Sequence, residues 1–142
     1  MEKWTGAAGI CVNDRNEMLM VREEIAGGGS AWTVPAGGVE PPETVEQCAV
    51  REMAEETGYL ARVLEKLRVK SGEYEHLGIA YEVHYFLMEA IGGQAELQDP
   101  DNLVREIGWK PLQEVKSLPL VYPEDRKYLA SRLEKGFKLN SV

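Results

Sequence analysis

The stretch that decides the fold runs from residue 37 to residue 59 and reads GGVEPPETVEQCAVREMAEETGY. Its second half predicts a helix from Thr44 to Thr57. Thr44 and Gln47 have the spacing of a capping box, in which each side chain accepts a hydrogen bond from the other residue's backbone amide. Gly58 follows, at the position where helices commonly end on a left-handed residue. Apolar residues at every fourth position supply a packing stripe: Val45, Ala49 and Met53.

Three glutamates share one face of this predicted helix. At 100° per residue, Glu52, Glu55 and Glu56 fall within an arc of about 100°, in the last turns, where the helix dipole disfavours negative charge. Two such charges about 6 Å apart repel by roughly 3 kcal/mol at an effective dielectric near 20. One interpretation is a solvated acidic face. The other is a cation site, and carboxylate oxygens favour a hard cation such as Mg²⁺ or Mn²⁺.

A glycine turn at residues 35–40 precedes the helix and predicts a close approach of backbone to a ligand. Turn and helix together carry the pattern Gly37-x5-Glu43-x7-Arg51-Glu52-Met53-x-Glu55-Glu56-x-Gly58-Tyr59. This pattern resembles the signature of the Nudix hydrolases at every fixed position, with an aromatic residue at 59 where an aliphatic one is more usual. The segments at 32–35 and 106–114 are also similar to the family, so the resemblance covers about residues 5–135.

The resemblance implies a fold and a reaction. The expected fold is α/β, a single Nudix domain over residues 1–142 with a mixed β-sheet sandwiched between α-helices in α/β/α layers. The expected reaction is metal-dependent hydrolysis of a phosphoanhydride bond in a nucleoside triphosphate, an oxidised nucleotide or a nucleotide sugar, with Mg²⁺ or Mn²⁺ as cofactor. The alternative is a non-catalytic Nudix module that senses nucleotides, although such modules usually lose the carboxylates that this chain has kept.

Positions that match the signature imply roles for individual residues. The implied metal ligands are three carboxylates, helped by the backbone carbonyl of Ala36: Glu52, Glu55 and Glu56. Arg51 and Glu43 are the implied pair that orients the helix and its carboxylates, which places Arg51 with the catalytic group. The general base stays open between Glu52 and Glu55.

Other residues are candidates for contacts with substrate. Arg22 resembles a family position that can hold substrate phosphate, and Gly37 and Gly38 are expected to bring backbone close to it. Three acidic residues lie where relatives often supply a further ligand or base from a late loop: Asp99, Asp101 and Glu106. Trp32 and Tyr81 have the chemistry to stack on a nucleobase, and the alternative for both is a place in the core.

The composition of the chain excludes some classes of function. With 142 residues, 44% hydrophobic and 28% charged, the chain has the size and makeup of one globular domain. Its net charge of −8 disfavours nucleic acid polymers and anionic membranes as partners, since both reward clustered lysine and arginine. Two cysteines without a CxxC pair, and no signal-peptide or membrane-length apolar run, indicate a reduced, cytoplasmic protein. We therefore expect a small-molecule nucleotide as partner, and a homodimer is compatible with this class.

Outside the deciding stretch, alternation and turn residues predict the remaining elements. Strands are expected at residues 6–12, 17–22, 31–34, 61–69, 78–89 and 106–109. A short helix is expected to start at Pro111, and a terminal helix to run from Pro123 to about Lys135.

Overall fold

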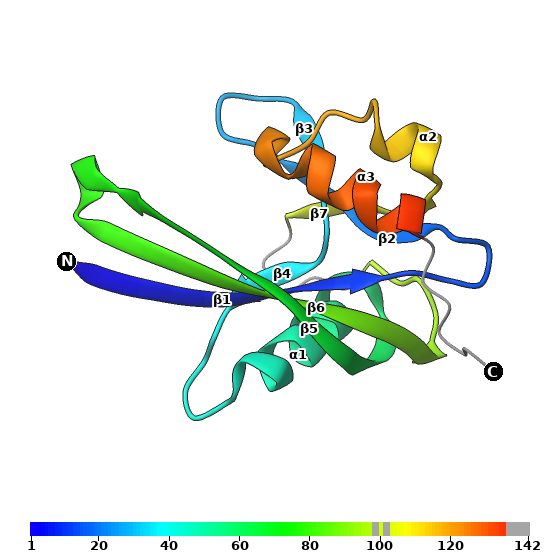
Figure 1. The fold of residues 1–142 in the computed structure, drawn as a ribbon, viewed down its shortest axis with the longest axis horizontal. Helices are drawn as coiled ribbons and strands as arrows, with labels where there is room; N and C mark the ends of the chain where they lie inside the picture. Colours follow the sequence, from blue (N-terminus) through cyan, green and yellow to red (C-terminus); the bar gives the residue numbers. More distant parts are fainter. Residues whose placement is uncertain (98–99, 101–102, 136–142) are drawn as a thin grey trace.

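The computed structural model describes residues 1–97, 100 and 103–135. The helix predicted from the deciding stretch is α1, with Thr44 as its N-cap residue. The elements follow one another along the chain as drawn in Figure 1: β1 (Glu2–Cys11), β2 (Met18–Glu24), β3 (Ser30–Thr33), β4 (Ala36–Gly38), α1 (Val45–Thr57), β5 (Tyr59–Tyr74), η1 (Glu75–Leu77), β6 (Ile79–Gly93), β7 (Val104–Lys110), α2 (Leu112–Val115), η2 (Pro123–Asp125) and α3 (Arg126–Lys135).

Four strands form a mixed sheet in the order β4-β1-β6-β5. β1 pairs in parallel with β6 along its whole length, from Glu2 opposite Ile79 to Cys11 opposite Met88. β4 and β5 run antiparallel to their neighbours. β5 and β6 are 16 and 15 residues long, longer than predicted, and form a hairpin around η1 whose far end projects from the body beside the N-terminus (Figure 1).

β1 and β2 are consecutive in the chain but belong to different sheets, and they separate directly after the turn between them. Asn13 holds the turn, because its Oδ1 accepts from the amides of Arg15 and Glu17, and a single bridge joins Val12 and Met18 before the strands diverge. β2 then pairs in antiparallel fashion with β3 and β7, in the order β3-β2-β7. The expected α/β class is confirmed, but the strands divide between two sheets where the sequence predicted one.

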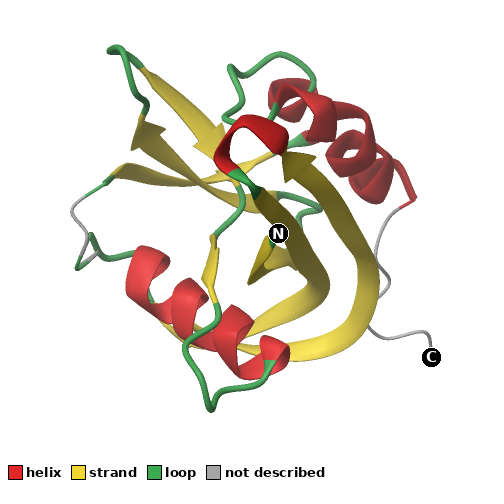
Figure 2. Cartoon of the chain, turned by 90° about the vertical axis from the view of Figure 1, so that its left-hand side faces the viewer, coloured by secondary structure: helices red, strands yellow, loops and turns green. Residues whose placement is uncertain are grey.

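Helices cover the strands from two sides, as Figures 1 and 2 show. Because side chains alternate along a strand, β1 serves both sides with small residues. Ala7 and Cys11 belong to the core cluster under α1, whereas Ala8 and Ile10 belong to the cluster under α2 and α3. No helix in the described ranges is long and apolar enough to cross a membrane.

A short strand takes the place of the glycine turn expected at residues 35–40. β4 pairs with β1, with Gly38 opposite Gly6 and Ala36 opposite Ala8. Small residues on both strands let the two backbones form a regular ladder, so the pairing with β1 outweighs the local turn preference of the glycines. β4 lies at the edge of its sheet, which puts the residues that follow it next to α1.

Candidate functional site

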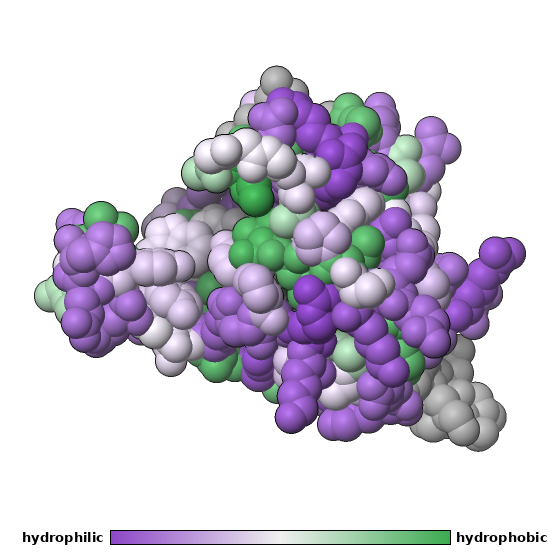
Figure 3. Space-filling view, turned by 90° about the horizontal axis from the view of Figure 1, so that it is seen from above, coloured by the Kyte–Doolittle hydropathy of each residue, from purple (hydrophilic) through white to green (hydrophobic). Residues whose placement is uncertain are grey.

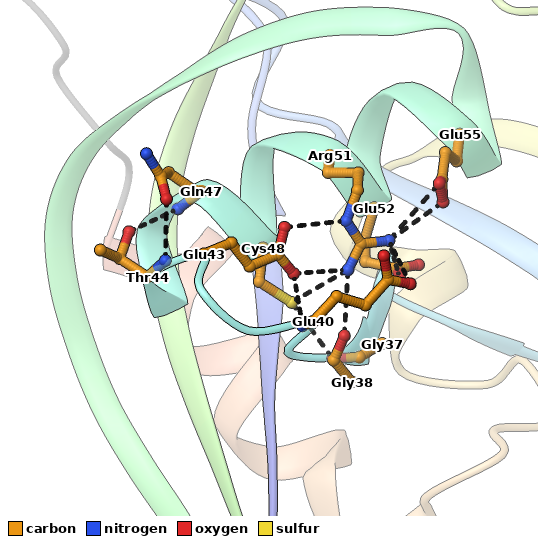
Figure 4. Close-up of polar contacts among 10 residues, drawn as sticks. All are labelled: Gly37, Gly38, Glu40, Glu43, Thr44, Gln47, Cys48, Arg51, Glu52 and Glu55. Atoms are coloured by element: carbon orange, nitrogen blue, oxygen red, sulfur yellow. Dashed lines mark hydrogen bonds and ion pairs between the residues drawn. The ribbon is translucent and has the colours of Figure 1, made fainter.

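Local sequence builds α1 as predicted. Thr44 Oγ1 accepts from the amide of Gln47 at 3.1 Å, and Gln47 Oε1 accepts from the amide of Thr44 at 2.8 Å (Figure 4). At the other end Gly58 has φ of 83°, and its amide donates to the carbonyl of Ala54 at 2.9 Å. The predicted stripe of Val45, Ala49 and Met53 packs into the core. The helix is therefore fixed at both ends and along its apolar face, which holds its acidic face in one place.

Arg51 ties the acidic residues of α1 to the segment before the helix (Figure 4). Its Nε and Nη2 donate to the two carboxylate oxygens of Glu43 at 3.0 and 2.7 Å. This hydrogen-bonded pair lowers the pKa of Glu43 to about 2 and raises that of Arg51. Nη2 also donates to the carbonyl of Gly38 at 3.0 Å, which joins α1 to β4.

The three glutamates of the acidic face have different surroundings. Arg51 Nη1 donates to Glu52 Oε1 at 2.7 Å and to Glu55 Oε1 at 3.1 Å. Glu56 is 8% exposed, and its Oε1 accepts from the amide of Ala36 at 3.1 Å. Two carboxylates are thus turned toward the guanidinium, and the third is anchored on the backbone of β4.

Gly37 makes room for Glu52. A methyl group at position 37 would lie 2.6 Å from Glu52 Oε2 and closer still to the rest of that carboxyl group. Gly37 does not have a positive φ, so the need for glycine is steric. Gly38 points to the opposite side of β4, where a methyl group would lie 3.1 Å from Trp4 Nε1. Each glycine accommodates a side chain, and their contact with substrate stays a prediction.

The donor set of the acidic face suits a hard divalent cation. Glu52, Glu55 and Glu56 offer carboxylate oxygens, the ligand type that Mg²⁺ and Mn²⁺ prefer. In the part of the chain that the structure describes, no three acidic, histidine or cysteine side chains already converge as a metal-binding group. The residues fit the cation by chemistry, and two of them contact β4: Glu52 lies against Gly37, and Glu56 accepts from the amide of Ala36.

A cavity of about 740 Å³ extends from this edge across the face of the four-stranded sheet. This volume is within the range of roughly 300–1,000 Å³ that is usual for small-molecule sites. Seen from above, the surface is hollowed between the projecting hairpin end and the helix-covered body (Figure 3). Glu52 and Glu56 line the cavity, and aromatic residues from three strands and one loop line it too: Trp4, Tyr74, Tyr81, Tyr85 and Tyr122.

Lys70 brings a positive charge to the wall of the cavity. Its Nζ donates to Glu124 Oε2 at 2.8 Å and to Asp125 Oδ1 at 2.9 Å. Burial lowers the pKa of Lys70, but these two hydrogen bonds outweigh burial and raise the pKa above its ordinary value. The ammonium group therefore stays charged at neutral pH and holds η2 against β5.

Arg22, the predicted phosphate contact, does not line the cavity. Its Nε donates to Glu106 Oε1 at 3.0 Å and its Nη1 to Ser30 Oγ at 3.0 Å, whereas the next residue, Glu23, lines the cavity. Arg22 and Glu106 thus pair with each other across β2 and β7, and their contact with substrate or cation stays a prediction. The other two acidic candidates lie outside the described residues: Asp99 and Asp101.

The aromatic candidates separate in the structure. Trp32 is 5% exposed and belongs to the core, with Lys110 Nζ 4.2 Å from its ring. Tyr81 lines the cavity. Sequence reasoning missed Trp4, Tyr74 and Tyr122, which line it as well. The alternating pattern of β6 was the only sequence signal for this group, and it concerns Tyr81 alone. Trp4 lies beside Tyr81 because β1 pairs in parallel with β6, and no local sequence pattern predicts that pairing.

Comparisons with known proteins agree on one family. The model of the NUDIX domain matches residues 3–131. The "Putative mutator protein MutT4" of Mycobacterium tuberculosis (strain CDC 1551 / Oshkosh) is 40% identical over 102 residues, which make up 68% of this chain and 38% of that protein. The "8-oxo-dGDP phosphatase NUDT18" of Mus musculus is 31% identical over 103 residues, 72% of this chain and 30% of that protein. The matched region is thus well under half of either relative.

Solved structures show the same fold. A NUDIX hydrolase from Nitrosomonas europaea superposes with a TM-score of 0.81 at 20% sequence identity, covering 95% of this chain and 90% of that chain. A MutT NUDIX hydrolase from Burkholderia pseudomallei superposes with a TM-score of 0.74 at 23% identity, covering 92% and 98% of the two chains. At these identities the likeness concerns the fold alone.

Proposed function

The chain belongs to the Nudix family, and on that premise we propose that it hydrolyses a phosphoanhydride bond in a small nucleotide with the help of a divalent cation. The observation that carries the proposal is the assembly of Glu43, Arg51, Glu52, Glu55 and Glu56 beside a cavity of about 740 Å³. A solvated acidic face would not need a buried carboxylate or a glycine that makes room for another.

Glu52, Glu55 and Glu56 are the residues that would hold Mg²⁺ or Mn²⁺. When bound, such a cation neutralises charge that develops on the phosphate oxygens and lowers the pKa of a water molecule. Arg51 and Glu43 position the carboxylates, because one guanidinium bonds Glu43, Glu52 and Glu55 together. They act on the reaction through the glutamates.

The reaction needs a group that takes a proton from water as water attacks phosphorus. The new bond joins the water oxygen to phosphorus, the bridging P–O bond breaks, and the second phosphate group leaves with the electron pair. Glu52 and Glu55 are the candidate bases. Their side chains are 13% and 33% exposed, and comparison of the Glu52→Gln and Glu55→Gln pH–rate profiles decides between them.

The substrate class is proposed from the relatives and from charge. One relative is named for 8-oxo-dGDP and another as a mutator protein. On the basis of these names, we propose oxidised guanine nucleotides first among the nucleoside triphosphates, oxidised nucleotides and nucleotide sugars. The net charge of −8 favours small nucleotides over nucleic acid polymers. The two free thiols, Cys11 and Cys48, support a reducing, cytoplasmic setting.

Hydrolysis of a nucleotide panel with Mg²⁺ tests the proposal. The panel contains dGTP, 8-oxo-dGTP, 8-oxo-dGDP, a nucleotide sugar and a 5′-triphosphorylated RNA, and chromatography identifies the products. We expect at least one small nucleotide to give a nucleoside monophosphate, and chelation of the metal to stop the reaction. No turnover of any member, or RNA turnover above every small nucleotide, would contradict the proposal.

A further inference from the structure

Three aromatic side chains form a row across the sheet face that the cavity covers. Trp4 of β1 and Tyr81 of β6 are direct partners in the parallel pairing. Tyr81 and Tyr74 of β5 lie with ring centroids 5.1 Å apart and ring planes inclined by 33°. We call Trp4, Tyr81 and Tyr74 the aromatic row. All three line the cavity, so their rings lie along the same side of three neighbouring strands.

Glycines lie beneath the aromatic row and leave room for its rings. Gly6 and Gly38 are opposite one another on β1 and β4. A methyl group on Gly6 would lie 2.8 Å from Trp4 Cζ3, and one on Gly38 would lie 3.1 Å from Trp4 Nε1. The indole therefore lies flat on two glycines. Gly72 does the same for Tyr81, since a methyl group there would lie 2.7 Å from Tyr81 Cζ.

The row keeps much of its apolar surface exposed. Trp4 and Tyr74 are each 45% exposed, and Tyr122, which comes from the segment before η2, is 44% exposed. All three line the cavity. Large aromatic side chains normally bury most of their surface. Here Trp4 lies against two glycines, and all three side chains are left open toward the cavity, an arrangement that suits a flat apolar ligand group.

We propose that the aromatic row is the platform on which the nucleobase of the substrate stacks, with Trp4 as its main contact. The inference rests on the proposed function, which puts the phosphates at Glu52 and Glu56, in the same cavity as the row. The three rings are uncharged, whereas the nearby charged lining is mostly acidic, so an uncharged flat base is accommodated there better than a phosphate. Stacking on aromatic rings tolerates any base because each base has a π-face.

Intrinsic fluorescence tests binding without turnover. The probe is guanosine 5′-(α,β-methylene)triphosphate, which resists cleavage at the first phosphoanhydride, and inorganic triphosphate is the probe that lacks a base. With Mg²⁺ present, we expect saturable quenching by the nucleotide and none by inorganic triphosphate. Trp4→Phe should lose most of the quenching, because Trp32 is buried and Trp109 contacts Tyr59 under α1. Unchanged quenching in Trp4→Phe overturns the proposal.

Steady-state kinetics on the best nucleotide substrate provide the second readout. Trp4→Leu should raise KM by roughly 5- to 150-fold, the range for losing one base–aromatic stack, with kcat changed less than about threefold. Trp4→Phe should recover most of the loss in KM because it restores a ring. Ile91→Ala removes a side chain that is 60% exposed and outside the cavity lining, and should leave KM unchanged.

The two proposals fail in different ways. If the wild-type chain hydrolyses no nucleotide, the proposed function fails, whether or not the nucleotide quenches Trp4. If hydrolysis proceeds and Trp4→Leu keeps the wild-type KM, the row is a structural feature of the hairpin and the base binds elsewhere. If Trp4→Leu lowers kcat and leaves KM unchanged, the platform assignment is also wrong.

Discussion

Gly37→Ala tests whether the position of Glu52 matters for the chemistry. The added methyl group would lie 2.6 Å from Glu52 Oε2, whereas ordinary contacts begin near 3.4 Å. The carboxylate must therefore move by roughly 1 Å. Gly37 has no positive φ, so alanine brings no backbone strain, and the substitution acts through Glu52. A misplacement of about 1 Å in a catalytic group costs up to about 10²-fold in rate.

The assay for Gly37→Ala is kcat and kcat/KM at several Mg²⁺ concentrations, with thermal unfolding measured beside it. We expect kcat to fall by about 10- to 100-fold while the variant stays folded, because overpacking costs about 1–3 kcal/mol. Gly92→Ala is the matched control, since its methyl group would meet Leu60 at 3.7 and 3.8 Å. Wild-type kcat in Gly37→Ala, at low as well as high Mg²⁺, would refute the role given to Glu52.

Two further predictions concern the charges of the site. The hydrogen bond from Arg51 lowers the pKa of Glu43 to about 2. Glu43 therefore stabilises the fold fully above its unfolded pKa near 4.5 and loses this contribution as the pH falls toward 2. In acid denaturation, the difference in unfolding free energy between wild type and Glu43→Gln should decrease as the pH falls through this range, and a constant difference would contradict the pairing. Saturating Mg²⁺ or Mn²⁺ should raise the melting temperature by about 5–10 °C, because a ligand at a hundredfold excess over Kd adds about 2.7 kcal/mol. Glu52→Gln/Glu56→Gln should melt no lower than wild type without metal and lose most of the rise; a full shift in this variant would place the cation elsewhere.

The helix could be predicted because its determinants are local. The capping box of Thr44 and Gln47, the left-handed Gly58 and the apolar stripe all lie within fifteen residues of one another, and each acts through neighbours along the chain. The order of the strands depends instead on contacts between distant segments. The pairing of β1 with β6 places Trp4 beside Tyr81. The pairing of Gly6 with Gly38 makes this segment a strand, β4, where the local sequence predicts a glycine turn.

The candidate site was predictable in its residue types and less so in its contacts. The shared face of Glu52, Glu55 and Glu56 follows from helical spacing alone, whereas the pairing of Arg51 with Glu43 came from the resemblance to the family. The anchoring of Glu56 on the amide of Ala36 depends on where β4 lies against α1. Arg22 points toward Glu106, whereas Glu23 lines the cavity. Which of the two faces the cavity depends on how the second sheet is oriented, and local sequence does not determine that orientation.

The most direct measurement of the central claim is turnover of Glu56→Gln at subsaturating Mg²⁺. Glutamine keeps the side-chain length and an oxygen that can accept from the amide of Ala36, the bond that Glu56 makes at 3.1 Å. We therefore expect the fold to be preserved, while the negative charge and one of the two ligand oxygens are lost. We predict that activity on the best small nucleotide falls by at least about 10²-fold, the scale for removing one preorganised electrostatic group. Wild-type turnover in this variant, at Mg²⁺ well below saturation, would show that the acidic face of α1 does not hold the cation.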